Sequence, residues 1–232
     1  MNFIPNKLRG FPHIDEHNWL IHHILIDFIR RIAKEHACGT LVDIGCGTKP
    51  YQSIFELYVH RYIGIDLKKS KKRKLYADIV ADAYHTSMKD ASCELVLCSE
   101  VLEHLEDPGK ALTEIYRILK EDGIAIVTTP FFWHIHEPPR DFYRFSEYGL
   151  QYLFREARFE IIEITPLTGF CVTFTQLLVY FLMRFQKGVL LRTVGRPLNW
   201  GMQHLALWLN NYDRSSEFTN LYGVVARKRA VP

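Results

Sequence analysis

The sequence lacks the features that mark several protein classes. Its five cysteines are odd in number and form no C-x-x-C pair, so neither a disulfide framework nor a zinc finger is indicated. The 29 Lys and Arg against 26 Asp and Glu leave a net charge of +3, which is too small to indicate nucleic-acid binding by itself. Repeats and low-complexity tracts are absent. With 48% hydrophobic residues over 232 positions, we expect one globular domain with its own core.

Long apolar runs are also missing. Residues 1–17 contain prolines and charges where a signal peptide needs an unbroken apolar run, so we expect a cytoplasmic protein. Segment 169–185 is very apolar, but it is short and includes Arg184, whereas spanning a bilayer takes about 20 apolar residues. Together with 204–209 it indicates a helical cap over the active site, a homodimer face or a peripheral membrane contact.

The sequence does contain β-rich runs that alternate with helical ones. The expected strands are 40–44, 61–66, 78–82, 94–99, 123–129, 159–164 and 221–228, and the expected helices are 17–37, 108–120 and one that follows the N-cap Ser146. This alternation predicts a parallel sheet with crossover helices. We divide the domain into an N-terminal helical extension (1–38), a core (39–165), an apolar helical insertion (166–215) and a final strand with its tail (216–232).

The stretch LVDIGCGTKPY, residues 41–51, reads as a buried strand that enters a glycine-rich turn. Glycines at 45 and 47 allow a ligand to approach the backbone without a Cβ in the way, although a tight turn without a ligand is the alternative. Pro50 stands where a dinucleotide motif needs its third glycine, which disfavours NAD. Asp43 at the strand end suits a cationic or hydrogen-bond-donating ligand.

With IGID (63–66), VADAY (80–84), SEVLEHLEDPGKAL (99–112) and ILKEDGIAIVTTP (118–130), this motif resembles the class I S-adenosylmethionine-dependent methyltransferases of the type 11 group. The resemblance covers roughly residues 40–165. It implies an α/β Rossmann-like fold with a mostly parallel seven-stranded sheet in the order 3-2-1-4-5-7-6. Strand 221–228 would then lie antiparallel beside strand five, after a helical insertion.

The resemblance also implies S-adenosyl-L-methionine as the cofactor and a set of residues that bind it. Asp66 would hold the ribose, and Asp82 the adenine amino group, unless Asp82 is an ordinary turn or N-cap aspartate. Ser99 and Glu100 would line the methionine part. The whole cofactor-binding set comprises Asp43, Gly45, Cys46, Gly47, Asp66, Leu67, Asp82, Ala83, Ser99 and Glu100.

Residues 130–150, PFFWHIHEPPRDFYRFSEYGL, follow strand five at the same edge of the sheet. They resemble the H-x-H-E-x-P-x-D-x-Y-R-[FY]-[ST] signature of a subset of these enzymes that is often linked to cell-surface polysaccharide pathways. The candidate bases for a hydroxyl acceptor are, in order, His136, His104 and Glu137, with helix-end capping as the alternative for His104. A carboxylate acceptor would need no base.

The candidate substrate-binding residues are His134, Arg140, Tyr143 and Arg144, although packing of an aromatic loop explains Tyr143 and Arg144 equally well. Asp141 suits a structural pairing with Arg140, Arg144 or a backbone amide. We expect no metal, because His134, His136 and Glu137 form an incomplete ligand set.

We therefore expect methyl transfer to a small-molecule or glycan-type acceptor, at oxygen. The basic run KKSKKRK, 68–74, motivates an RNA methyltransferase as an alternative, and a solvated surface loop is its plainer explanation. A catalytically silent domain that binds the cofactor or a partner is the alternative outside enzymes. The sequence does not decide the acceptor, the base or the oligomeric state.

Overall fold

The computed structural model describes residues 17–67, 76–183, 185, 189–213 and 216–229. The amino-terminal segment 1–16, the basic run 68–74 and Arg184 lie outside the described residues. The chain divides into two compact units: a larger one of residues 29–131, 135–165 and 222–232, and a smaller one of residues 1–28, 132–134 and 166–221.

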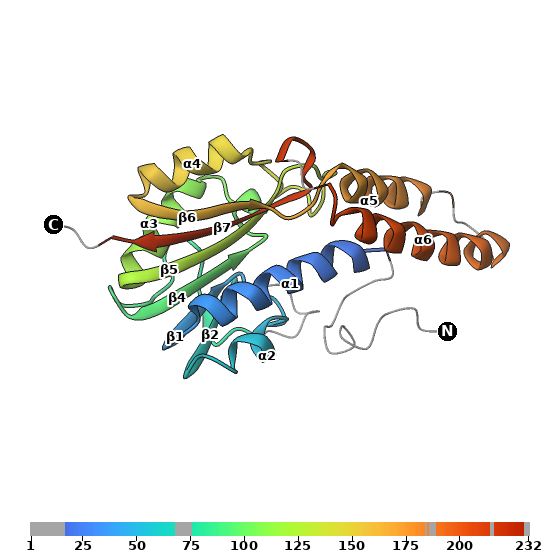
Figure 1. Ribbon diagram of the computed structural model, residues 1–232. Coiled ribbons are helices and arrows are strands. Elements are labelled where there is room, and N and C mark those ends of the chain that lie inside the picture. The colour runs from blue at the N-terminus through green and yellow to red at the C-terminus, as the bar shows by residue number, and fades with distance from the viewer. Residues whose placement is uncertain (1–16, 68–75, 184, 186–188, 214–215, 230–232) are drawn as a thin grey trace. The chain divides into compact units, whose positions relative to one another are not determined.

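The larger unit is built on a seven-stranded sheet in the order β3-β2-β1-β4-β5-β7-β6. Its strands are β1 (Thr40–Ile44), β2 (Arg61–Asp66), β3 (Ile79–Val80), β4 (Cys93–Ser99), β5 (Leu119–Pro130), β6 (Phe159–Pro166) and β7 (Leu221–Lys228). The neighbours from β3 to β5 pair in parallel, whereas the arrow of β7 points against that of β4 (Figure 1). The predicted strand order is therefore confirmed.

Two helices of the larger unit, α3 (Pro108–Ile118) and α4 (Glu147–Glu156), cover the same face of the sheet (Figure 1). Both begin as their sequences require. The Asp107 side chain accepts the amide of Lys110 at 3.1 Å before Pro108, and Ser146 accepts the amide of Gly149 at 3.2 Å. Their apolar stripes are fully buried against the sheet, which gives the core Ala111, Leu112, Ile115, Ile118, Leu150 and Phe154.

The predicted boundaries fail at two strands. Strand β3 keeps only two of its five expected residues, because the Asp82 carboxylate accepts the amides of Tyr84 and His85 and turns the chain there. Strand β5 begins at Leu119, which pairs with Cys93, whereas a strand was expected only from 123. The pairing is interrupted before it resumes between Leu95 and Ile124, and Asp122 in this interval has a φ of 59°.

Helix α1 (Trp19–His36) begins in the smaller unit and ends in the larger one. In the smaller unit it meets the helical insertion, which consists of α5 (Phe170–Met183) and α6 (Val189–Leu209). The amide of Leu20 donates to Oε1 of Gln203 at 3.2 Å, and the Trp19 ring stacks on His204 with centroids 4.2 Å apart. The short elements α2 (Gln52–Phe55), η2 (Leu102–His104) and η3 (Ser216–Phe218) complete the set.

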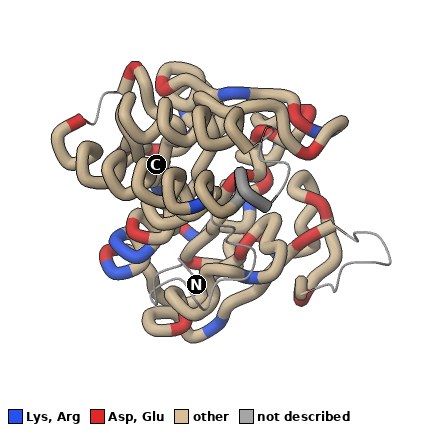
Figure 2. Tube along the Cα trace, turned by 90° about the vertical axis from the view of Figure 1, so that its right-hand side faces the viewer, with Lys and Arg blue, Asp and Glu red and all other residues tan. Residues whose placement is uncertain are grey.

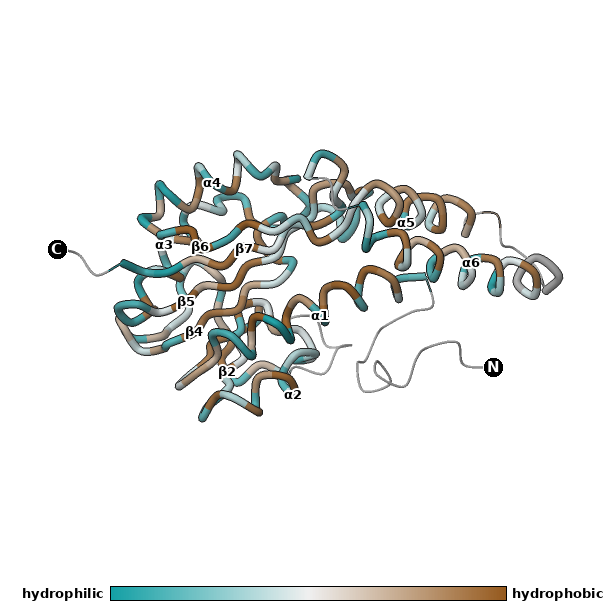
Figure 3. The backbone as a smooth tube through the Cα atoms, viewed as in Figure 1, coloured by the Kyte–Doolittle hydropathy of each residue, from teal (hydrophilic) through white to brown (hydrophobic). Residues whose placement is uncertain are grey.

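Helix α5 carries no charged residue, and the charged residues of the protein lie mostly outside α5 and α6 (Figure 2). Both helices are largely apolar (Figure 3), and many of their apolar side chains are exposed. The large exposed ones are Phe170, Phe174, Phe181, Val194, Leu198, Trp200, Leu205 and Trp208. Among the described residues, none of the helices combines the length and apolar character needed to cross a bilayer. The predicted cap, homodimer and membrane-contact roles of this region all stay predictions.

Candidate functional site

Three chain segments meet at the carboxyl edge of the sheet. Strand β4 lies between β1 and β5 and pairs in parallel with both, so the segments that leave these strands gather at one edge. They are the Gly45–Gly47 turn, residues 99–104 and the loop that follows Pro130. In open α/β sheets this edge is where ligands bind.

The two glycines of the first turn are required for different reasons. Both have positive φ, 73° at Gly45 and 53° at Gly47. A Cβ at Gly45 would lie 2.4 Å from Cγ2 of Val101, so the missing side chain makes room for another part of the protein rather than for a ligand. A Cβ at Gly47 would meet nothing within 4 Å. The open backbone face of this turn is therefore at Gly47.

Asp43, at the end of β1, is 3% exposed. Its Oδ2 accepts the hydroxyl of Tyr62 at 2.5 Å. Burial raises the pKa of the Asp43 carboxyl to about 7; the hydrogen bond from Tyr62 opposes the shift and the nearby charge of Asp66 adds to it. The turn after β1 thus holds a buried carboxylate with no cation bonded to it among the described residues.

Asp66, at the end of β2, is fixed by the backbone. Its Oδ2 accepts the amide of Gly47 at 2.9 Å, and its Oδ1 accepts the amide of Leu67 at 2.7 Å. The carboxylate therefore has a set orientation beside the open face at Gly47. Its remaining lone pairs can accept the hydroxyls of a ribose.

Three other residues predicted to bind the cofactor are partly engaged within the protein. The Cys46 thiol packs on β2, because a Cβ at Gly64 would lie 2.7 Å from its sulfur, and burial raises the pKa of this thiol to about 12. Ala83 is buried, and Asp82 uses Oδ1 for the turn described above. The turn alternative for Asp82 is thus realised through one oxygen, and its adenine contact stays a prediction.

Ser99 and Glu100 follow β4 and contact the end of β5. The Ser99 hydroxyl lies 2.8 Å from that of Thr128, and the amide of Glu100 donates to the Thr128 carbonyl oxygen at 3.0 Å. Glu100 has a φ of 55°, and its Oε1 is buried without a hydrogen-bond partner among the described residues. Burial raises the pKa of its carboxyl to about 7.

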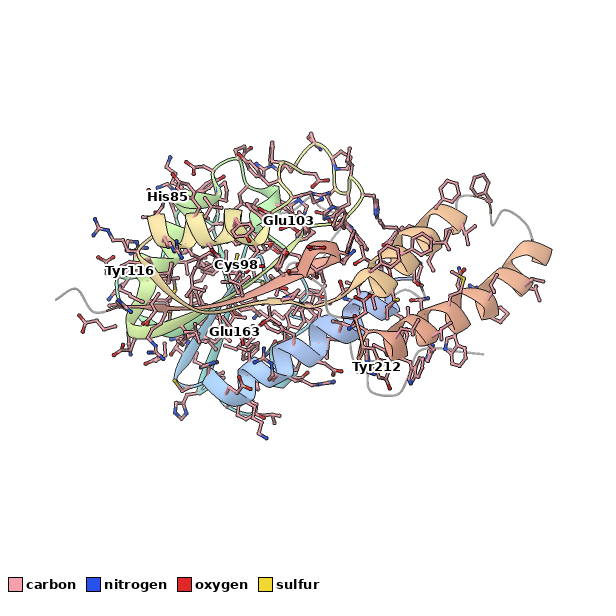
Figure 4. The ribbon with its side chains drawn as sticks, turned by 45° about the horizontal axis from the view of Figure 1, so that its top comes forward. His85, Cys98, Glu103, Tyr116, Glu163 and Tyr212 are labelled. Carbon is pink, nitrogen blue, oxygen red and sulfur yellow. The ribbon has the colours of Figure 1, made fainter. Side chains whose placement is uncertain are left out.

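Glu103, His104 and His136 form a cluster whose ligand-type atoms, one from each residue, all lie within 4.8 Å of one another. Glu103 is completely buried, and Figure 4 labels it in the segment that follows β4. Burial raises the pKa of the Glu103 carboxyl well above its ordinary value and lowers that of His136. His104 does not cap a helix end; its Nδ1 donates to the carbonyl oxygen of Arg140 at 2.5 Å.

Sequence reasoning missed Glu103. A sequence signal for the cluster does exist. The pair Glu103-His104 follows the fourth strand and His134-x-His136 follows the fifth, and these two strands were expected to be neighbours in the sheet. Glu137, the third candidate base, is exposed and has a φ of 51°; its catalytic role and those of His136 and His104 stay predictions.

The loop after β5 is held by an ion pair. The Arg144 guanidinium donates to both oxygens of Asp141 at 2.6 and 2.9 Å, and Asp141 also accepts the amide of His136 at 2.8 Å. These contacts lower the pKa of Asp141 to about 2, and its predicted pairing is confirmed. The Tyr143 hydroxyl donates to the Glu106 carbonyl oxygen at 2.9 Å.

The four predicted substrate-binding residues are not all in one unit. His134 belongs to the smaller unit, where its ring lies 4.4 Å from that of Tyr180, whereas Arg140, Tyr143 and Arg144 belong to the larger unit. Arg140 is exposed, and the polar groups of the other two are engaged within the loop. Their substrate contacts stay predictions.

Comparison with known proteins places this edge in a chemical context. Residues 42–127 match the family described as a methyltransferase domain. A Mycolicibacterium smegmatis protein named as a probable S-adenosylmethionine-dependent methyltransferase is 27% identical over 141 residues, 56% of this chain and 54% of that protein. The chain therefore spans about half the length of that relative. A ubiquinone biosynthesis O-methyltransferase of Nitrosomonas europaea is 25% identical over 67% of this chain and 72% of its own.

Residues 42–127 therefore resemble a methyltransferase domain, and the chain is similar to proteins named as S-adenosylmethionine-dependent methyltransferases. Solved structures agree with this fold. The [4+2]-cyclase SpnF superposes with a TM-score of 0.62 at 20% identity, covering 96% of this chain and 87% of that one. A Haemonchus contortus phosphoethanolamine N-methyltransferase solved with S-adenosylhomocysteine gives 0.56 at 18% identity, covering 93% and 56%.

The residues at the edge fit this cofactor. Gly47 leaves backbone open beside the Asp66 carboxylate, which suits the diol of a nucleoside. The buried carboxyls of Asp43 and Glu100 suit a ligand that carries an ammonium group and a sulfonium.

Proposed function

We propose that the protein transfers a methyl group from S-adenosyl-L-methionine to a hydroxyl of a small-molecule or glycan-type acceptor. The observation that carries the proposal is the open backbone at Gly47 beside the fixed Asp66 carboxylate, within the segment matched to the methyltransferase family. The similarity to a ubiquinone biosynthesis O-methyltransferase supports oxygen as the methylated atom.

The residues would divide the work in the following way. Asp66 holds the ribose hydroxyls, Asp82 and the Ala83 amide receive the adenine, and Ser99 with Glu100 lines the methionine end. When bound, S-adenosylmethionine supplies an electrophilic methyl group on a positively charged sulfur, and the electron pair of the carbon–sulfur bond stays on the sulfur when the methyl group is transferred. The protein contributes in-line placement of the acceptor oxygen and exclusion of water.

The loop after β5 supports the narrower proposal of a glycan-type acceptor. Residues 134–146 keep every fixed position of the signature described above, and the Asp141–Arg144 ion pair joins two of these positions within the loop. Methylation assays with a panel of nucleotide-linked sugars, lipid-linked sugars and phenolic acceptors test this step. Transfer only to phenols would contradict it.

Calorimetry with S-adenosylmethionine and S-adenosylhomocysteine tests the function itself. We expect one site per chain for both ligands and transfer of labelled methyl to an acceptor in the panel. If neither ligand produces a heat of binding, the proposed methyltransferase activity is contradicted. Binding without transfer to any acceptor would favour the catalytically silent domain, and salt-sensitive binding and methylation of RNA would favour the RNA methyltransferase.

A further inference from the structure

We propose that Glu103, His104 and His136 bind a divalent first-row transition-metal ion at the carboxyl edge of the sheet. The three residues come from two segments, one after β4 and one after β5. Their candidate ligand atoms lie within 4.8 Å of one another. The cluster is partly shielded, because Glu103 is fully buried and both histidine rings are half-buried.

The spacing is close to that of a formed site. Ligand atoms about 2.1 Å from a tetrahedral ion are about 3.4 Å apart. Nε2 of His104 and Oε1 of Glu103 lie 3.8 Å apart. The separations of the three groups, at most 4.8 Å, exceed that spacing, so the side chains would have to move closer together to bind one ion.

The orientation of His104 is the one that a metal ligand needs. Its Nδ1 faces the carbonyl oxygen of Arg140, and since a carbonyl only accepts, Nδ1 must carry the proton. The neutral ring then has its lone pair on Nε2, the nitrogen that faces Glu103. Metal-binding histidines are commonly fixed in this way through their second nitrogen. His136 is positioned differently: its backbone amide donates to Oδ2 of Asp141 at 2.8 Å, and its Nδ1 lies 3.5 Å from Nη2 of Arg144.

Glu103 is the independent sign that a cation belongs here. Both of its carboxylate oxygens are buried and lack a hydrogen-bond partner among the described residues. The approach of His104 at 3.8 Å is too long for a hydrogen bond. Oε1 of Glu100 is a third buried carboxylate oxygen without a hydrogen-bond partner among the described residues, and the Arg144 guanidinium is engaged by Asp141. Buried carboxylates are normally paired or bound to metal.

Two imidazoles and one carboxylate select the kind of ion. This set is typical of catalytic zinc sites and of other first-row metals with open positions, whereas Mg²⁺ and Ca²⁺ prefer oxygen ligands throughout. Three protein ligands leave at least one position open for an exchangeable group.

The role we assign to that position rests on the proposed function. An acceptor hydroxyl bound to the ion would lose its proton to water more readily, since such ions lower the pKa of a bound oxygen. The resulting oxygen forms the bond to the methyl carbon as the carbon–sulfur bond breaks, and the electron pair of that bond stays on sulfur. The ion would also hold the oxygen in place.

The test is metal binding by the full chain without a histidine tag. Zn²⁺ is titrated calorimetrically and Co²⁺ by its visible absorption, in the absence of S-adenosylmethionine. We expect one ion per chain. The variants Glu103→Gln and His136→Ala should each weaken binding by at least about tenfold. His60→Ala, which removes an exposed histidine outside the cluster, should bind as the wild type does.

Thermal melts show whether each variant folds, and they provide a second readout. Zn²⁺ should raise the melting temperature of the wild type and of His60→Ala, and should fail to raise that of Glu103→Gln. No stoichiometric binding, or equal binding by Glu103→Gln and the wild type, would overturn the metal site. S-adenosylhomocysteine is titrated separately, so that loss of the metal site and loss of the proposed function are distinguished.

Discussion

The amide of Gly47 donates a hydrogen bond of 2.9 Å to Oδ2 of Asp66, across 19 residues of sequence. This bond joins the turn after β1 to the end of β2. The residue with the open backbone and the carboxylate predicted to hold the ribose are therefore parts of one structure, and their contributions can be separated by mutation.

Asp66→Ala should lower the affinity for S-adenosylhomocysteine by about 10- to 100-fold, because hydrogen bonds to a charged group contribute about 1.5–3 kcal/mol. Calorimetry measures the change. Asp90→Ala is the matched control, since its side chain is 80% exposed and pairs only with Arg117 in the described structure. Unchanged affinity in Asp66→Ala would show that Asp66 does not hold the ribose.

Gly47→Ala should lower stability only slightly, by about 1 kcal/mol, because the cost is the positive φ alone. Its cofactor affinity should fall much further, since the new methyl group enters the open space. Chemical denaturation and calorimetry on the same variant give the two values. A proportionate loss of both would mean that the space at Gly47 is not used by the ligand.

Gly45→Ala should behave in the opposite way. Its Cβ would overlap Val101, so we expect a stability loss of about 2–4 kcal/mol from strain and overpacking together. Adding Val101→Ala should recover the part of that loss that comes from overlap. The part that comes from the positive φ at residue 45 should remain. The double variant is compared with each single variant by denaturant unfolding, and no recovery would exclude the contact with Val101 as the cause.

Stability should fall as the pH rises from about 4 to about 7, through Asp43. Between these values the unfolded chain has released this proton and the folded protein, whose Asp43 pKa is about 7, still holds it. The upper limit of the effect is about 4 kcal/mol. Asp43→Asn should abolish this component, so melting curves of the variant and the wild type should agree near pH 4 and differ most above pH 7. An unchanged pH profile in the variant would contradict the raised pKa.

Asp141 and Arg144 should be energetically coupled. Asp141→Asn and Arg144→Gln each break the two-bond ion pair, and we expect each to cost about 1–3 kcal/mol. The double variant should cost little more than either single one, as a double-mutant cycle by denaturant unfolding would show. Additive losses would mean that Arg144 has another principal partner.

Local sequence patterns were enough to predict most of the strands and helices. The runs 40–44, 61–66 and 221–228 coincide with β1, β2 and β7, because short β-rich segments bounded by turns are a local signal. The order of the strands came from the resemblance to a family. What the sequence could not reveal depends on distant contacts: Val101 filling the space at Gly45, and Leu119 pairing with Cys93.

The sequence predicted those parts of the candidate site whose residues lie in short motifs, and missed the parts that depend on contacts between distant segments. Asp66 and Gly47 follow motifs with a fixed spacing, and their adjacency is observed. The cluster of Glu103, His104 and His136 joins two loops, and its partners become visible only when β4 and β5 are paired. His134 and His136, only two residues apart, fall in different compact units, which no periodicity in this segment indicates.

The interruption between Leu119 and Ile124 in β5 has a practical consequence. Lys120, Glu121 and Asp122 are exposed and lie where β5 begins, at the opposite end of the strand from Pro130 and the loop that carries His136. Extra residues placed between Glu121 and Asp122 would lengthen a segment that is already outside the regular ladder. A fluorescent label at this point would report on unfolding of the sheet and would leave the carboxyl edge of the sheet unobstructed.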